Sequence, residues 1–422
     1  MFKRILLNII RLFFTKCLVL VLTILFTRVV ISTIGENNYG EYVYLWSIVL
    51  VLLSCEFGFL NGLRNDYIKI KLRGDNICGE ISKCRFYIFI FSFISTIVFI
   101  IIVISGLYEL KIVVNRNIYL FSLTLIPIIQ GFRVIHSINF ANHKPHYNVI
   151  INIIQLLLSI SSIKLLSIYK ECNINNVIII VLMSHIVSFL IFKNFVNKTN
   201  IKVNFNSVIK NHRIKINTLK RNFLFFAVQI LYIFYTYINI FIIKTDYSKS
   251  NLNEFTLSYQ YLNIVFLTFI GLITPFWSEI NEAKENNKKS LRKLANLLIA
   301  TLIVPSVGII IMINWRQSIF PLIIGIKSSQ LSYQTFLCTG FYIFSTCLIF
   351  SSAFFHNAIN SLKLQVIVIL FAITYIYVSI KIKDYKSFHS VINLTSCMNV
   401  MIFLILFAST HYFISKKEKY IK

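Results

Sequence analysis

Four basic residues stand inside long apolar stretches of this 422-residue chain: Lys16, Arg28, Arg133 and Lys164. A cation at the centre of a membrane helix costs roughly 2.5–3.5 kcal/mol on insertion scales, so it usually faces a partner or a wet cavity. Near a helix end, a long side chain can extend to the interface instead, which is the alternative for Lys16, Arg28 and Lys164. Arg133 stands deepest, and its alternative is an internal ion pair or helix cap. We predict that the four bind an anionic group.

Only one acidic residue stands well inside an apolar stretch, namely Glu56 in LLSCEFGF (Leu52 to Phe59). Its carboxylate could bind a proton or a sodium ion, or it could neutralise one of the four cations. One carboxylate among four cations should stay ionised, so we favour the neutralising role. All four cations stand in the first half of the chain, and we expect the second-half spans to contain no buried charge.

Amide and hydroxyl side chains recur at helical spacing in three apolar stretches. Gln130 shares a helical face with Arg133, and similar stripes include the further candidate substrate contacts Gln155, Gln229 and Asn239. The alternative is hydrogen bonding between helices, worth roughly 0.6–2 kcal/mol per contact. Because the stripes come from both halves, they favour a hydrophilic central chamber.

Signatures of enzymes and of nucleotide or metal sites are missing from the sequence. The segment GDNICGEI (Gly74 to Ile81) has the spacing of a phosphate-binding loop, but Glu80 takes the lysine position and would repel phosphate. The eight cysteines show no metal-ligand spacing. We therefore expect no catalytic residue, no metal, no cofactor and no enzymatic activity.

The elements that carry these residues must be membrane-spanning helices. Hydrophobic residues make up 57% of the chain and charged residues only 14%, against about a quarter in a soluble protein. The apolar runs are continuous and about twenty residues long, which excludes the alternating pattern of a membrane barrel. We predict an all-α polytopic membrane protein with about twelve spans, near 12–34, 39–63, 86–106, 118–140, 148–168, 176–192, 222–243, 255–277, 294–313, 331–351, 364–380 and 389–414.

The net charge of +27 reflects the orientation of these helices. With the N-terminus inside, the inner connectors hold 28 of the 42 lysines and arginines and the outer connectors hold 10. This bias follows the positive-inside rule and predicts that both termini are cytoplasmic. The basic residues then contact anionic membrane lipids, and we expect no nucleic-acid partner.

A basic connector divides the chain into two sets of six helices. Residues 193–221 carry eight basic residues and no acidic one. We predict an N-terminal six-helix bundle over 1–196, a cytoplasmic linker over 197–219 and a C-terminal six-helix bundle over 220–422. At an offset of 213 residues Glu41 matches Glu254 and Gly58 matches Gly271, which favours a parallel duplication.

The segment FTRVVISTIGENNYGEYVYLWSIVLVLLSCEFGFLNGLRNDY (Phe26 to Tyr67) resembles the opening of bacterial polysaccharide transporters. In that family an arginine ending the first helix precedes a glycine, a Tyr-Gly pair and an acid-x-Gly element in the second helix. The matching positions are Arg28, Gly35, Tyr39-Gly40 and Glu56-Phe57-Gly58. Glu56 stands where aspartate is more frequent, which keeps the charge.

The resemblance implies a flippase of the O-antigen or capsule type, in the multidrug/oligosaccharidyl-lipid/polysaccharide exporter superfamily. Such antiporter-like proteins serve polysaccharide and lipopolysaccharide biosynthesis. They move undecaprenyl-diphosphate-linked oligosaccharide across the bacterial cytoplasmic (inner) membrane. Two bundles in a V shape open alternately to each side, driven by a gradient of H+ or Na+, and a polysaccharide polymerase is an implied partner. The sequence leaves the sugar composition, the coupling ion and the oligomeric state open.

Two alternatives belong to other classes of protein. A polysaccharide polymerase is also polytopic and basic, but such enzymes typically carry a large outer loop with catalytic residues, and the longest outer connector here is 314–330. A drug or cation exporter of the same superfamily needs buried acids for its cargo, and the sequence offers Glu56 alone.

The predicted orientation can be tested by labelling single cysteines on a cysteine-free background. Cysteines introduced at 200–215 should react only from the cytoplasm, and those at 246–252 only from outside, because the basic connectors stay on the cytoplasmic side. Labelling of 200–215 in intact cells would contradict the orientation and the side from which substrate enters.

Overall fold

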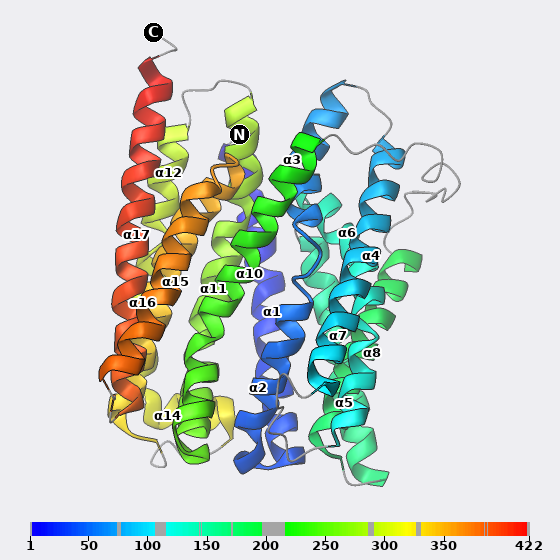
Figure 1. The fold of residues 1–422 in the computed structure, drawn as a ribbon, viewed down its shortest axis with the longest axis vertical. Coiled ribbons are helices and arrows are strands. Elements are labelled where there is room, and N and C mark those ends of the chain that lie inside the picture. The colour runs from blue at the N-terminus through cyan, green and yellow to red at the C-terminus, as the bar shows by residue number, and fades with distance from the viewer. Residues whose placement is uncertain are drawn as a thin grey trace. The chain divides into compact units, whose positions relative to one another are not determined.

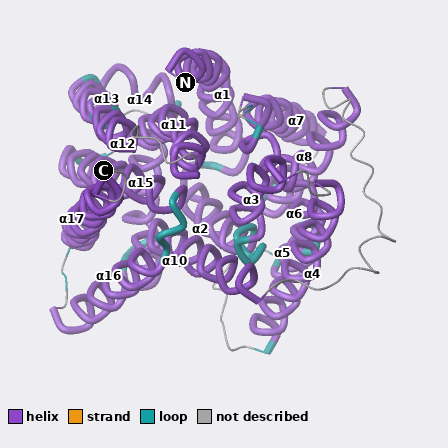
Figure 2. Tube along the Cα trace, turned by 90° about the horizontal axis from the view of Figure 1, so that it is seen from above, coloured by secondary structure: helices purple, strands orange, loops and turns teal. Residues whose placement is uncertain are grey.

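The computed structural model describes residues 2–73, 77–105, 115–142, 144, 146–169, 172–195, 216–285, 291–325, 331–383, 385 and 387–419. Within these ranges the chain is helical throughout and contains no strand (Figures 1 and 2). The first half contains α1 (Phe2–Ile34), α2 (Glu36–Leu52), α3 (Phe59–Arg73), α4 (Ile77–Ile104), α5 (Arg116–Leu123), α6 (Ile126–Ala141), α7 (His146–Tyr169) and α8 (Ile174–Phe195). The second contains α10 (Ile216–Asp246), α11 (Lys249–Glu285), α12 (Leu291–Ala300), α13 (Ile303–Asn314), α14 (Arg316–Ile324), α15 (Tyr333–Ala358), α16 (Lys363–Lys383) and α17 (Phe388–Lys419).

The prediction of a multi-pass helical membrane protein is confirmed. Eleven segments in the described ranges are long and apolar enough to cross a membrane. The predicted span at 39–63 was expected as one helix, but it consists of α2 and α3, of 17 and 15 residues, separated by a break. The predicted spans 118–140 and 294–313 are also helix pairs, α5–α6 and α12–α13. The short helix α14 lies in a connector for which no helix was expected.

Contacts between residues group the chain into two compact units. The N-terminal unit is residues 21–230, and the C-terminal unit is residues 1–20 with 231–422. The first turns of α1 therefore belong to the C-terminal unit, and the first turns of α10 belong to the N-terminal unit. Residues 197–215 of the predicted linker lie outside the described ranges, and the bundle boundaries at 196 and 220 stay a prediction.

In the N-terminal unit α3, α4 and α6 pack against one another, and α7 packs against α8. Phe59, Leu63, Ile88 and Val134 belong to a buried apolar cluster between the first three of these helices. The ring of Phe59 stacks on Tyr87, with centroids 5.6 Å apart and planes at 7°. This packing fixes the start of α3 against α4 and α6.

In the C-terminal unit α15 lies between α11 and α17 and is largely buried. At the N-terminal end of α15, Thr335 donates to the Glu254 carboxylate over 2.6 Å and lies 2.8 Å from Nε2 of His389. Ser332 caps the same helix, and its backbone N–H also reaches Glu254, at 2.9 Å. Glu254, which matches Glu41 at the offset of 213 residues, therefore helps to join the ends of α11, α15 and α17.

The first turns of α10 lie very close to α3. A Cβ atom built on Gly58 would lie 2.6 Å from Cβ of Phe225 and 2.8 Å from the backbone nitrogen of Phe226. Gly62, four residues later, faces the Asn222 side chain in the same way. This spacing of two glycines is the one that lets membrane helices approach backbone to backbone.

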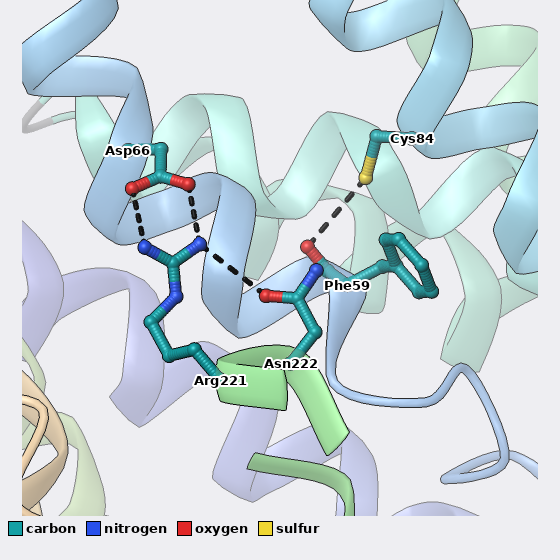
Figure 3. A network of polar contacts seen from close by, with 5 residues as sticks. All are labelled: Phe59, Asp66, Cys84, Arg221 and Asn222. Atoms are coloured by element: carbon teal, nitrogen blue, oxygen red, sulfur yellow. Dashed lines mark hydrogen bonds and ion pairs between the residues drawn. The ribbon is translucent and has the colours of Figure 1, made fainter. Parts of the chain in front are cut away.

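An ion pair secures the same contact. Both ends of the Arg221 guanidinium donate to the Asp66 carboxylate, at 2.8 and 2.5 Å (Figure 3). Arg221 also reaches Asn222 at 3.4 Å, and Cys84 of α4 donates to the carbonyl of Phe59 at 3.5 Å. A planar two-point arginine–carboxylate pair holds geometry as well as charge, so α10 can neither slide nor rotate freely on α3.

Substituting alanine at Gly58 should destabilise the protein. Gly35→Ala is the matched control, because both glycines have positive φ (69° at Gly58 and 81° at Gly35) but only Gly35 has open space around it. The clash with α10 should therefore lower the stability of Gly58→Ala beyond that of Gly35→Ala by about 1–3 kcal/mol. The measurement is thermal unfolding of the purified proteins in detergent, and equal stabilities would contradict the close contact.

Candidate functional site

The break between α2 and α3 lies within the segment that carries the family resemblance. Helix α2 ends at Leu52, with Leu53 as its C-cap. The chain then turns through Ser54 and Cys55, and α3 begins at Phe59, whose N–H donates to the Glu56 carbonyl at 3.2 Å. Phe57 and Gly58 both adopt positive φ, 52° and 69°. Irregular backbone at membrane depth persists only where other groups pair with it, and broken helices commonly carry the binding sites of transporters.

The freed carbonyl of Leu53 is the first feature of the site. It accepts hydrogen bonds from the amide of Gln130 and from the guanidinium of Arg133, both on α6. Arg133 also donates to Oε1 of Gln130 at 3.2 Å. Two predicted site residues thus meet at the break, and their spacing of three residues places both on one face of α6.

Glu56 is the second feature, and it is only 1% exposed. Gln229 of α10 and Gln130 of α6 hydrogen-bond to its side chain, and the charge of Arg133 acts on it. Its second oxygen, Oε2, has no hydrogen-bond partner in the described part of the chain. Four predicted residues, Glu56, Gln130, Arg133 and Gln229, therefore come together in the N-terminal unit.

Three predicted residues of the N-terminal unit lie elsewhere. Arg28 and Lys164 are exposed. Lys164 neighbours the exposed side chains of Leu165 and Ile168, 60% and 75%, as expected for a lysine that extends from a lipid-facing surface. Gln155 is buried but bonds within its own helix, to Ser159 at 3.2 Å.

The two remaining predicted residues belong to the C-terminal unit. Asn239 is fully buried and donates to Thr395 of α17 at 3.0 Å. The methylene groups of Lys16 pack over Gly271 of α11, where a built Cβ would lie 3.2 Å from Cγ of the lysine. The described contacts of Asn239 are those of a residue that joins helices, which was its alternative role.

Some site residues were missed by the sequence argument. Arg64 is 7% exposed, and its guanidinium lies 4.3 Å from the centre of the Phe140 ring. It stands one residue beyond the predicted span 39–63, so it was counted as part of a connector. Asn61, which bonds Gln229 at 3.2 Å, was overlooked because an isolated asparagine shows no periodic pattern.

The expectation that the second-half spans contain no buried charge is wrong. Glu279 on α11 is 1% exposed. The predicted span ended at 277, but α11 continues to Glu285, so the helix is longer than its most apolar core. Buried charge is therefore present in both halves of the chain.

Comparisons with known proteins identify the fold. No family model matches the sequence, and no curated protein matches it either. Solved structures do match: an outward-facing multidrug resistance MATE family transporter of the MOP superfamily has a TM-score of 0.72 at 12% identity, covering 99% of this chain and 96% of that chain. A MATE structure in the straight conformation has a TM-score of 0.70 at 12% identity, covering 99% of this chain and 97% of that chain.

A third match is a MOP superfamily transporter from Pyrococcus furiosus, with a TM-score of 0.73 at 12% identity, covering 97% of this chain and 96% of that chain. The reverse polarity of that transporter's binding pocket suggests a different function for it. The present chain thus has the all-helical fold of these MATE and MOP superfamily transporters. The helical transporter fold expected from the resemblance is confirmed.

Replacing Glu56 by glutamine should destabilise the protein, because it removes the negative charge beside Arg133. Losing one member of a buried charge pair costs roughly 3–5 kcal/mol, and the partial exposure of Arg133 places the loss below that range. Glu56→Asp should be tolerated because the charge survives. The readouts are membrane abundance and thermal unfolding in detergent.

The control is Glu80→Gln, which removes an exposed carboxylate paired with Lys83 at 3.0 Å. That variant should behave like the wild type. A Glu56→Gln protein as abundant and heat-stable as the wild type would exclude the neutralising role.

Proposed function

We propose that the chain is an ion-gradient-coupled flippase that carries lipid-linked oligosaccharide through a diphosphate group, across the cytoplasmic membrane of a bacterium. The observation that carries the proposal is the convergence of Arg133, Gln130 and Glu56 on the helix break. That break is formed by Glu56-Phe57-Gly58, which is also the element that resembles polysaccharide transporters. Fold and motif therefore support the same class of carrier.

The charges around the break favour an anionic cargo. Arg133, Arg64 and Arg85 lie on the three helices that surround it, and Arg85 stands 5.5 Å over the ring of Phe132. Among the described acids of these helices, Asp66 is engaged by Arg221 and Glu80 by Lys83, so Glu56 faces an excess of arginine. Arginine suits phosphate groups because its planar fork offers paired N–H donors.

A drug or cation exporter is the second candidate, and the comparisons favour it by name. One matched structure is a multidrug resistance transporter. The sequence argument against this candidate was that Glu56 is the sole buried acid, but Glu41 and Glu279 are also buried, at 2% and 1% exposure. The polymerase alternative loses support, because the matched fold is that of transporters.

Several finer points remain part of the proposal. We propose that both termini are cytoplasmic, that H+ or Na+ drives the cycle, and that a polymerase receives the product. Arg28, Lys16, Lys164, Gln155 and Asn239 are proposed as further substrate contacts, outside the cluster at the break. Each of them is secondary to Arg133 in the tests below.

The cargo is tested with purified protein in proteoliposomes. A fluorescent polyprenyl-diphosphate oligosaccharide should be translocated, and a fluorescent lipophilic cation should not. Arg133→Ala should abolish translocation while membrane abundance stays near normal, and Arg133→Lys should retain part of it because the charge survives. Lys381→Ala is the control and should keep most of the activity, since that exposed lysine of α16 is not among the proposed substrate contacts.

Two outcomes would overturn parts of this proposal. Export of the cation without movement of the diphosphate lipid would establish the second candidate. The other outcome is that Arg133→Lys loses as much activity as Arg133→Ala while both proteins are well inserted. Arg133 would then serve to hold the Leu53 carbonyl in a fixed geometry, and not to bind a mobile diphosphate.

A further inference from the structure

Asn61 of α3 donates its side-chain N–H to Oε1 of Gln229 at 3.2 Å. A primary amide has one oxygen acceptor and one nitrogen carrying two hydrogens. With its oxygen engaged by Asn61, the nitrogen of Gln229 is the group available to Glu56, and the two side chains do hydrogen-bond. The bond from Asn61 thus determines which end of the amide faces the carboxylate.

The backbone that carries Gln229 is fixed independently of this bond. Arg221, two turns earlier on α10, is held by Asp66, and Phe226 stacks on Phe57 of the break with centroids 4.2 Å apart and planes at 11°. Gly58 leaves room for the α10 backbone. Because α10 is anchored at these points, the main motion still open to Gln229 is rotation of its side chain. The hydrogen bond from Asn61 restricts that rotation.

We infer that Asn61 is a positioning residue of the transport site, which holds Gln229 with its N–H toward Glu56 and so keeps Glu56 ionised beside Arg133. An N–H donor stabilises a carboxylate, whereas an amide oxygen in its place would repel it. The inference rests on the proposed function in that it takes Glu56 as part of the transport site.

The other ionisable groups around Glu56 come from three elements. Arg133 faces it from α6, Cys55 adjoins it in the break, and Cys84 faces it from α4. Arg133 favours the ionised carboxylate, and neither thiol supplies a positive charge. Gln229 is therefore the contribution from α10, and its orientation decides the sign of that contribution.

The alternative is that Asn61 only joins α3 to α10. A double-mutant cycle separates the two roles, because a residue that acts through Gln229 has no effect once Gln229 is gone. The four proteins are the wild type, Asn61→Leu, Gln229→Leu and the double variant. The readout is the carboxylic-acid carbonyl band of Glu56 in infrared difference spectra of purified protein against pH, assigned by its absence in Glu56→Gln.

Asn61→Leu and Gln229→Leu should each move the midpoint of this band to higher pH by about one unit, a tenfold gain in proton affinity. The double variant should equal Gln229→Leu. Asn61→Ala, which removes the N–H donor and adds no charge, should shift the midpoint in the same direction as Asn61→Leu. Asn61→Ala also carries the test if the leucine variants do not accumulate.

Additive shifts in the double variant, or an unchanged midpoint in Asn61→Leu and Asn61→Ala, would overturn the inference. These spectra do not depend on the cargo. The double-mutant cycle could show the expected shifts although the protein fails to move the diphosphate lipid. That result would leave the inference in place and refute the proposed function.

Discussion

A backbone carbonyl inside a membrane protein must find a donor, and the Leu53 carbonyl is where this requirement organises the molecule. The break after α2 removes the N–H that a continuous helix would have supplied. Gln130 and Arg133 supply replacements, which brings a cation into the interior. Arg133 lies near Glu56, whose side chain also receives hydrogen bonds from Gln130 of α6 and Gln229 of α10. Charge at the site thus follows from an interruption of helical geometry.

Both units contain buried charge, but the hydrogen bonds between their helices differ in kind. The N-terminal unit uses charged groups at the break, among them Glu56, Arg64 and Arg133. In the described part of the C-terminal unit, neutral pairs join the long helices: Asn239 with Thr395, and Asn399 with Ser345 and Thr346, at 2.9–3.2 Å. Neutral pairs of this kind hold helices together without setting a charge preference. The cluster of Glu56, Arg64 and Arg133 at the break thus belongs to the N-terminal unit.

Hydropathy and charge were sufficient to predict the helical class and nearly every span, because solvation by lipid depends on composition over some twenty residues. The break was not predictable in this way, since Leu52 to Phe59 is as apolar as a continuous helix, and the positive φ of Phe57 leaves no compositional trace. Glu56, Gln130 and Arg133 were found because polar residues are expensive in such segments. Asn61 and Arg64 were not, because their importance arises from which helix they meet.

Gly58 and Gly271 match at the offset of 213 residues, although their local structures differ. Gly58 makes room for the first turns of α10, and Gly271 makes room for Lys16 in the first turns of α1. The first turns of α10 thus pack on the second span of the first half, and the first turns of α1 pack on the second span of the second half. The two units reflect this exchange, because residues 1–20 group with the C-terminal unit and residues 216–230 with the N-terminal unit. The glycine serves close packing in both copies, whereas only the first copy adds positive φ and breaks its helix. The position that matches Glu56 is Phe269, which lies within the continuous helix α11. The glycine therefore packs closely in both halves, but a helix break with a charged residue beside it occurs only in the first.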